Sequence, residues 1–312
     1  MLGRLFRRRG PAAETVRQPG EIPADLLQRV RAIEIRARRL VNALFLGEYK
    51  AVFRGRGIEF NDIRPYVPGD DVRALDWRTL ARTGEPFIKR YTEDRDLTAI
   101  FAVDVSRSGA VGMSETSKAD FAAEICAVLS LAAIRNRDRV GLLLFASRPE
   151  RYIRPQSGTT HVLRVVREIL WSRPQTIGTN IGAALEYLGG VQRRRAVIFL
   201  VSDFLSGDYG RQMRAISECH DVIAICVREP IDDELPDVGL ARLADSERGI
   251  SREVDTSSVA VRAAYRAWVQ ELDEERRHLF GSLGVDEIQV SVGEDYVPAL
   301  LRFFHRRAVA AA

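Results

Sequence analysis

The stretch Leu97-Thr-Ala-Ile-Phe-Ala-Val-Asp-Val-Ser-Arg-Ser108 decides the fold of this 312-residue chain. Its first seven residues form an apolar run of strand length, which ends at Asp104 and is followed by Ser106 and Ser108. A short apolar run of this kind is typical of a strand that is buried on both faces of a parallel sheet. Ligands of open α/β sheets bind at the carboxyl ends of such strands. The loop after this strand is therefore the first candidate site.

The same pattern recurs along the rest of the chain. Apolar runs alternate with amphipathic stretches of helix length, which predicts an α/β fold with a doubly wound, mostly parallel sheet. The segment 151–154 follows its preceding strand too closely for a crossover helix, so we expect one antiparallel edge strand there. The predicted strands are 97–103, 140–145, 196–202, 222–227 and 286–290, and the predicted helices lie near 118–134, 161–170, 181–188, 209–219, 259–280 and from 296 onward.

Three regions follow from changes in composition. Residues 1–22 read as a flexible basic tail, residues 23–96 as an amphipathic helix followed by a small β-rich subdomain, and residues 97–312 as the α/β domain. The tail lacks the apolar core of a signal peptide. An alternative for the tail is peripheral contact with an anionic membrane, through Leu2, Leu5 and Phe6 beside basic residues.

Composition excludes several classes of protein. The formal charge is +4, yet only three of the 47 basic residues are lysines (Lys50, Lys89 and Lys118) and no nucleic-acid-reading motif accompanies the arginines, so we expect no nucleic-acid partner. The three cysteines are unevenly spaced and form no C-x-x-C pair, which argues against a disulfide framework and a zinc site. No apolar run has the length of a transmembrane helix, and we expect a cytoplasmic protein.

A set of oxygen ligands is expected at one edge of the sheet. Asp203 follows a second strand, and Thr179 precedes a predicted helix, so parallel strands bring both residues to the same edge as the loop at Asp104. Mg²⁺ prefers six oxygen ligands, accepts one or two carboxylates and keeps positions for water or an outside ligand. The predicted ligands are Asp104, Ser106, Ser108, Thr179 and Asp203, with Mn²⁺ or Ca²⁺ as alternatives to Mg²⁺.

These five residues resemble the metal-ion-dependent adhesion site of von Willebrand factor type A domains, a D-x-S-x-S loop completed by a Thr and an Asp from later loops. The resemblance implies a von Willebrand factor type A-like fold and a cation that accepts a carboxylate from another protein. The alternative interpretation of Asp104 and Ser108 is helix capping and turn formation.

A second resemblance covers the segment before the first strand and most of the chain after it. Residues 63–71 (Ile-Arg-Pro-Tyr-Val-Pro-Gly-Asp-Asp), 72–77 and 81–84 are similar to the family called domain of unknown function 58. The resemblance implies a partner of MoxR-type AAA ATPases and other von Willebrand type A proteins, with an adaptor role in protein assembly or maturation. Many relatives carry membrane-spanning helices near the N-terminus, and none is predicted here. The signature residues are Arg64, Pro65, Tyr66, Gly69, Asp70, Asp71, Arg73, Asp76, Trp77 and Arg82.

The signature residues have two interpretations. Asp70 and Asp71 after Pro68 and Gly69 predict a turn and a helix start, because carboxylates are favoured in the first turn of a helix. Alternatively, the charges and the Trp77 indole form a contact surface for a partner.

The motifs favour binding over catalysis. The chain has no G-x-x-x-x-G-K-[ST] loop, so ATP hydrolysis by the P-loop route is not predicted. It also has no G-x-S-x-G motif, so catalysis by a nucleophilic serine of that motif is not predicted. A metal-dependent phosphohydrolase would need a nucleophilic carboxylate such as Asp104, but Ser106 stands where such enzymes carry a second Asp. We therefore predict a non-enzymatic, cation-dependent adaptor. The alternatives are a structural scaffold whose loop binds no metal, and the phosphohydrolase.

Overall fold

The structure is a computed structural model that describes residues 23–45, 49, 52–53, 58–71, 75–93, 97–106, 117–174, 176, 178–205, 208–245 and 250–311. The predicted tail 1–22, with its alternative of membrane contact, lies outside these residues. Within them, no helix is both long and apolar enough to cross a membrane.

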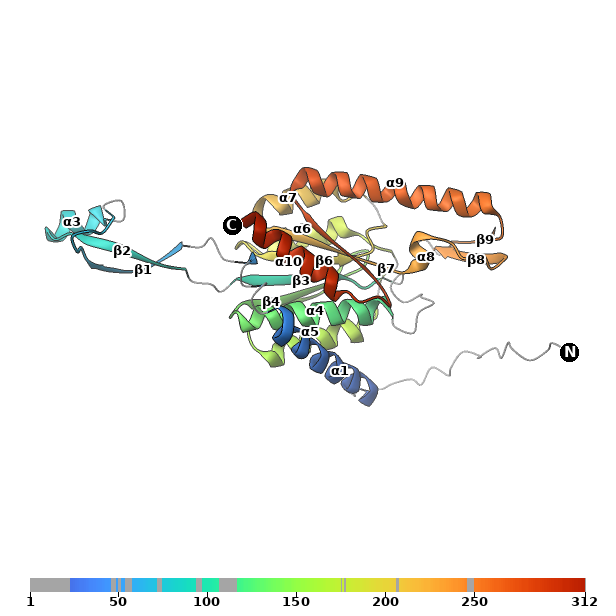
Figure 1. Ribbon diagram of the computed structural model, residues 1–312, viewed down its shortest axis with the longest axis horizontal. Coiled ribbons are helices and arrows are strands. Elements are labelled where there is room, and N and C mark those ends of the chain that lie inside the picture. Colours follow the sequence, from blue (N-terminus) through green and yellow to red (C-terminus); the bar gives the residue numbers. More distant parts are fainter. Residues whose placement is uncertain are drawn as a thin grey trace.

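A six-stranded sheet in the order β10-β7-β6-β3-β4-β5 forms the centre of the molecule (Figure 1). Its edge strand β5 (Pro149–Gln156) runs antiparallel to β4. The prediction of a mostly parallel sheet with one antiparallel edge strand is therefore confirmed. The five parallel strands are β3 (Thr98–Asp104), β4 (Arg139–Phe145), β6 (Val197–Ser202), β7 (Asp221–Arg228) and β10 (Asp286–Ser291).

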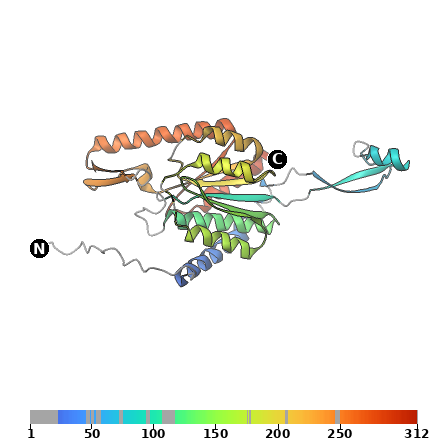
Figure 2. The same cartoon turned by 180° about the vertical axis from the view of Figure 1, so that it is seen from behind.

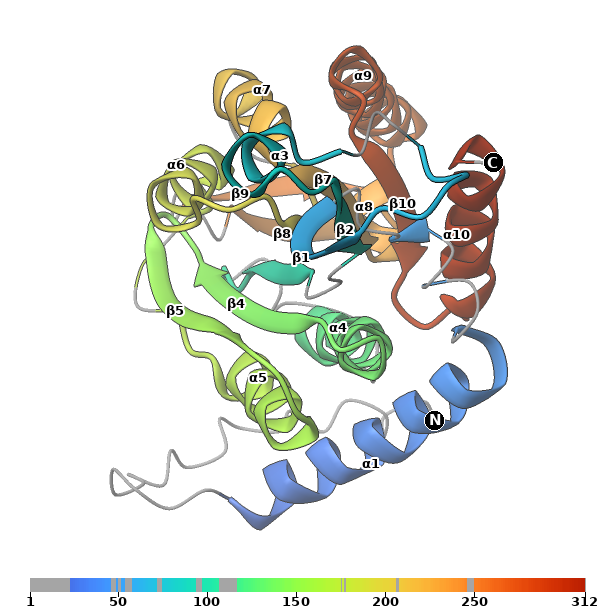
Figure 3. The ribbon, with the colours of Figure 1, turned by 90° about the vertical axis from the view of Figure 1, so that its left-hand side faces the viewer.

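Helices cover both faces of this sheet (Figure 3). Successive side chains of a strand point to opposite faces, so Phe101 packs on one side while Ile100 and Ala102 pack on the other. The side of Phe101 is covered by α4 (Lys118–Arg135), α5 (Thr159–Trp171) and α10 (Val297–Ala311). The other side is covered by α6 (Ile181–Val191), α7 (Gly210–Cys219) and the C-terminal part of α9 (Val259–Leu283). Both the strands and the helices bury apolar side chains in these two layers. The apolar pattern of strands and that of helices are therefore both visible in the sequence.

The N-terminal helix α1 (Ala24–Leu40) continues into a π-helical turn, Val41–Phe45, and packs against α4 and α5. Its apolar stripe enters the same core as Phe101, and on its polar side Arg29 pairs with Asp120 and Arg36 pairs with Glu124 at 2.7 Å. The helix is thus an outer layer of the α/β body.

Strands β1 (Ile58–Pro65) and β2 (Phe87–Glu93) form a hairpin that extends away from this body and carries α3 (Trp77–Thr83) near its tip (Figures 1 and 2). We call β1, α3 and β2 the paddle. The predicted helix start at Asp70 and Asp71 is wrong, because α3 begins at Trp77. Asp76 caps it instead, accepting hydrogen bonds from the Arg78 backbone N–H at 3.2 Å and from Thr79 Oγ1 at 2.8 Å.

Between β7 and α9 the chain forms elements that the sequence did not reveal. These are the short helix α8 (Pro230–Asp233) and the antiparallel hairpin of β8 (Leu240–Asp245) and β9 (Ile250–Asp255). They lie at the opposite end of the body from the paddle (Figure 1). The paddle leads into the amino end of β3, whereas α8 follows the carboxyl end of β7. The two insertions therefore extend from opposite ends of the parallel strands.

Aromatic side chains fill the middle of the core between β3 and β6. The rings of Phe101 and Phe199 are stacked with centroids 5.0 Å apart, and Phe53 meets Phe199 edge-on at 6.0 Å. Phe101 and Phe199 are fully buried. This cluster fixes the two strands that end in Asp104 and Asp203.

We expect Phe199→Ala to lower the free energy of unfolding by roughly 3 to 5 kcal/mol, because it removes a large buried ring and leaves a cavity. Val309→Ala, at a position that is 65% exposed, serves as the control and should change it by less than about 0.5 kcal/mol. Urea denaturation of the two variants beside the wild type measures the difference, and equal midpoints would contradict this account of the core.

Candidate functional site

Two neighbouring strands end in carboxylates at the same edge of the sheet. Asp104 is the last residue of β3, and Asp203 follows directly after β6, which pairs in parallel with β3. The Ser106 backbone N–H donates to Asp104 Oδ1 at 2.9 Å, and Ser202 Oγ donates to Asp104 Oδ2 at 2.8 Å. Short polar contacts therefore hold Asp104 in place between the two loops.

A cavity of about 280 Å³ opens above these residues. Asp104, Ser106 and Asp203 line it together with Ser202 and the start of α4 at Ser117 and Lys118. Ser106 and Asp203 are buried, with 3% and 8% of their surfaces exposed. The structure thus brings three of the five predicted ligands to one cavity at the carboxyl ends of the strands.

The electrostatics of this cavity disfavour two adjacent negative charges. Burial, together with the negative charge of Asp203, raises the pKa of Asp104 from 3.8 to about 6, although the hydrogen bonds from Ser106 and Ser202 oppose the rise. Removal of a carboxylate from water and proximity of a like charge both favour the protonated acid. A cation placed between Asp104 and Asp203 would remove this penalty.

A lysine that the ligand prediction did not include also lies at this cavity. The Lys118 side chain is buried, with its ammonium 3.5 Å from Asp203 Oδ2 and 2.7 Å from Asp232 Oδ2. Burial by itself lowers the pKa of Lys118, but the carboxylates of Asp203 and Asp232 outweigh it, so the pKa is raised and the side chain carries its charge. Asp104, by contrast, forms no ion pair among the described residues.

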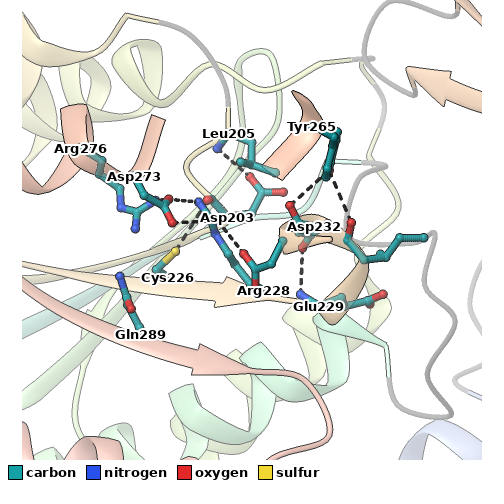
Figure 4. A network of polar contacts seen from close by, with 12 residues as sticks. Asp203, Leu205, Cys226, Arg228, Glu229, Asp232, Tyr265, Asp273, Arg276 and Gln289 are labelled. Carbon is teal, nitrogen blue, oxygen red and sulfur yellow. Dashed lines mark hydrogen bonds and ion pairs between the residues drawn. The ribbon is translucent and has the colours of Figure 1, made fainter. Parts of the chain in front are cut away.

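Asp232 comes from α8 and is held firmly (Figure 4). Its Oδ2 accepts the Glu229 backbone N–H at 2.8 Å, and its carbonyl oxygen accepts from Tyr265 of α9 at 3.2 Å. Next to it, Arg228 at the end of β7 pairs with Asp233 at 2.9 Å and with Asp273 of α9 at 2.5 Å. The loop after β7 was not predicted to belong to the site. Its signal in the sequence is Arg228-Glu229-Pro230, directly after the predicted strand 222–227.

The remaining two predicted ligands are placed differently. Ser108 lies outside the described residues. Thr179 is not among the described residues that line the cavity, but its loop lies beside the others, because Asn180 N–H donates to Ala146 O and Val105 N–H donates to Phe145 O. Thr179 Oγ1 is buried and has no hydrogen-bond partner within the described part of the chain.

This donor set fits a hard divalent cation. No cluster of three or more His, Cys, Asp or Glu side chains with metal-binding geometry occurs among the described residues. The candidate set instead combines two carboxylates with hydroxyl oxygens, which is a ligand set that Mg²⁺ accepts. The unfavourable proximity of Asp104 and Asp203 is a feature that such a cation would relieve.

Four of the signature residues, Arg64, Gly69, Asp70 and Asp76, help to shape the paddle. Asp70 accepts two hydrogen bonds from the Arg64 guanidinium at 2.7 Å, and these bonds lower the pKa of Asp70. Gly69 has φ +109°, a conformation that favours glycine. Trp77, however, is 65% exposed at the start of α3. Local folding therefore accounts for the contacts of Asp70 and Asp76, and Trp77 remains available for contact. Arg73 lies outside the described residues; Pro65, Asp71 and Arg82 are exposed, and Tyr66 is half-buried.

Comparison with known proteins gives both a family and relatives. The sequence profile of the family described as protein of unknown function DUF58 matches residues 62–275, more than half of the chain. Uncharacterised proteins of Mycobacterium bovis and Mycobacterium tuberculosis are each 29% identical over 281 residues, which is 89% of this chain and 88% of theirs. The crystal structure of a conserved hypothetical protein, BatB, from Bacteroides thetaiotaomicron is 16% identical and covers 68% of this chain and 99% of its own, with a TM-score of 0.45.

The raised pKa of Asp104 makes stability depend on pH. The folded protein holds this proton more tightly than the unfolded chain, so the carboxyl group stabilises the fold at low pH, and this contribution is lost as the pH rises through about 6. Asp104→Asn cannot ionise. We therefore expect the stability of this variant relative to the wild type to rise by about 2 kcal/mol between pH 4.5 and pH 7.5 in the presence of a chelator.

Chemical denaturation of both proteins at a series of pH values measures this difference. A difference between the two proteins that stays constant across the range would show that the pKa of Asp104 is not raised in the folded protein.

Proposed function

We propose that this chain, which belongs to the family of proteins of unknown function DUF58, is a divalent-cation-dependent protein-binding module. The observation that carries the proposal is a pair of carboxylates, the half-buried Asp104 and the buried Asp203, at the ends of adjacent parallel strands beside a cavity. Two carboxylates held close together repel each other. A cation site has this property before the cation binds, because the fold, and not the ion, brings the carboxylates together.

The ligands in this proposal are Asp104, Ser106, Ser108, Thr179 and Asp203, which follow the pattern of a von Willebrand factor type A-like adhesion site. A cation held by two carboxylates and neutral hydroxyls keeps most of its positive charge and an accessible coordination position. It would therefore accept a carboxylate from another protein. We propose Mg²⁺, with Mn²⁺ or Ca²⁺ as alternatives.

The partner in this proposal is a MoxR-type AAA ATPase, with which the chain would act as an adaptor in assembly or maturation of other proteins. The resemblance of the signature residues supports this part of the proposal. The three free thiols, Cys126, Cys219 and Cys226, support action in the cytoplasm, a compartment that keeps thiols reduced. The exposed Trp77 at the start of α3 offers a second contact, and α3 lies at the opposite end of the molecule from α8 (Figure 1).

We expect Mg²⁺ or Mn²⁺ to raise the melting temperature of the wild type, because a ligand that binds only the folded state stabilises it by about 3 kcal/mol at 100 times its Kd. Asp104→Ala should show no such rise. In chelator this variant should melt no lower than the wild type, since it removes a carboxylate whose ionised form is disfavoured by desolvation and by the charge of Asp203. Asp237→Asn, at a carboxylate that is 61% exposed, serves as the matched control and should respond to the cation as the wild type does.

If the melting temperature of the wild type is the same with either cation and with chelator, the result would favour the alternative of a scaffold whose loop binds no metal.

Partner binding should depend on the same cation. We expect a MoxR-type ATPase from the same genome to bind the immobilised wild type in Mg²⁺ and to dissociate in chelator, with binding reduced at least about tenfold by Asp104→Ala, a loss of about 1.4 kcal/mol. Biolayer interferometry measures both effects. Equal binding by wild type and Asp104→Ala, in Mg²⁺ and in chelator alike, would contradict the adaptor mechanism.

A further inference from the structure

The position of Lys118 has a consequence that rests on the proposed cation site. Its ammonium lies at the border of that site, 2.7 Å from Asp232 on one side and 3.5 Å from Asp203 on the other. We infer that Lys118 is a built-in cation that competes with the divalent ion for Asp203 and thereby sets the affinity of the site.

The two contacts of Lys118 are unequal. Asp232 is fixed by the Glu229 backbone N–H and belongs to a helix that Tyr265 anchors, and its distance to the ammonium is that of a charge-assisted hydrogen bond. The distance to Asp203 is longer and leaves room for movement. Lys118 can therefore withdraw toward Asp232 when an ion takes Asp203, without losing its ion pair.

The kind of residue also matters. Only three of the 47 basic residues of the chain are lysines, and one of them occupies this buried position. A lysine ammonium is a compact point charge on a flexible stem, whereas a guanidinium binds a carboxylate through a rigid two-pronged fork. A mobile internal cation is served better by lysine, because it can move between two carboxylates.

Electrostatics gives the direction of the effect. A positive charge beside Asp203 repels an incoming divalent ion and offsets part of the negative charge that attracts it. Asp232 holds this charge away from the centre of the site. Removal of the charge should therefore strengthen cation binding, and removal of its anchor should weaken it.

Titration calorimetry with Mn²⁺ and with Mg²⁺ tests this inference on the full chain. We expect Lys118→Met to bind the ions about tenfold more tightly than the wild type, and Lys118→Arg, which keeps the charge, to show no gain. We expect Asp232→Asn to bind about tenfold more weakly, because the ammonium loses its closest carboxylate and is left to the attraction of Asp203 and Glu229. The double variant Lys118→Met/Asp232→Asn should regain the tight binding, since no ammonium is left to compete.

Two controls accompany these variants. Arg302→Met removes one positive charge from an exposed position on α10 and should leave cation affinity unchanged, which separates a local effect from a change in net charge. Thermal melting in chelator shows that each variant is folded.

The possible outcomes separate the two proposals. Cation binding by the wild type that Lys118→Met leaves unchanged or weakens would overturn the role of Lys118 and leave the cation site standing. The same holds if Lys118→Arg gains as much affinity as Lys118→Met. Absence of binding in the wild type and in a folded Lys118→Met alike would overturn the cation site itself, and the competition with it. Binding by Lys118→Met but not by the wild type would support the competition, since it would show that the ammonium outcompetes the ion for Asp203.

Discussion

The negative charge at the carboxyl edge of the sheet is the constraint to which the rest of the site responds. Asp104 and Asp203 are brought together because β3 and β6 are neighbours in a parallel sheet, and the stacked rings of Phe101 and Phe199 join the two strands further along. Burial then makes the proximity costly, as the raised pKa of Asp104 indicates. The serine donors, the Lys118 ammonium and the proposed divalent ion are three means of offsetting one cost. Only the last two carry a positive charge, which is why they would compete.

The fold also separates two kinds of surface. The element α8 and the β8–β9 hairpin lie at one end of the body, whereas the paddle extends from the other (Figure 1). The proposed cation site, at the carboxyl ends of β3 and β6, belongs to the end that carries α8, because Lys118 beside Asp203 pairs with Asp232 of α8. A partner that contacts the cation and a partner that contacts Trp77 would meet different ends of the molecule. An adaptor that joins an ATPase to a second protein requires such a separation, and the parallel sheet provides it, since insertions at opposite ends of the strands emerge on opposite sides.

The paddle shows how part of a strong sequence signature can arise from local folding. Arg64 and Asp70 form a two-pronged ion pair across the turn, Gly69 adopts a backbone conformation that favours glycine, and Asp76 caps a helix of seven residues. Small elements without a large core depend on such polar contacts for their shape. The identities of Arg64, Gly69, Asp70 and Asp76 therefore follow from the shape of the paddle, whereas these contacts give no account of the exposed Trp77.

The sequence by itself determined the alternation of strands and helices, the antiparallel edge strand and the residues that end β3 and β6. Each of these features depends on local periodicity or on the number of residues between neighbouring elements, and both can be read directly from the sequence. Only the tertiary structure decided the start of α3, the insertion of α8 and the β8–β9 hairpin, and the presence of Lys118 and Asp232 at the site. Asp76 rather than Asp70 became the cap because Asp70 is taken by Arg64, a choice between two similar local signals. Lys118 and Asp232 are 114 positions apart in the chain, and the ion pair between them exists because α4 and α8 begin at the same edge of the sheet.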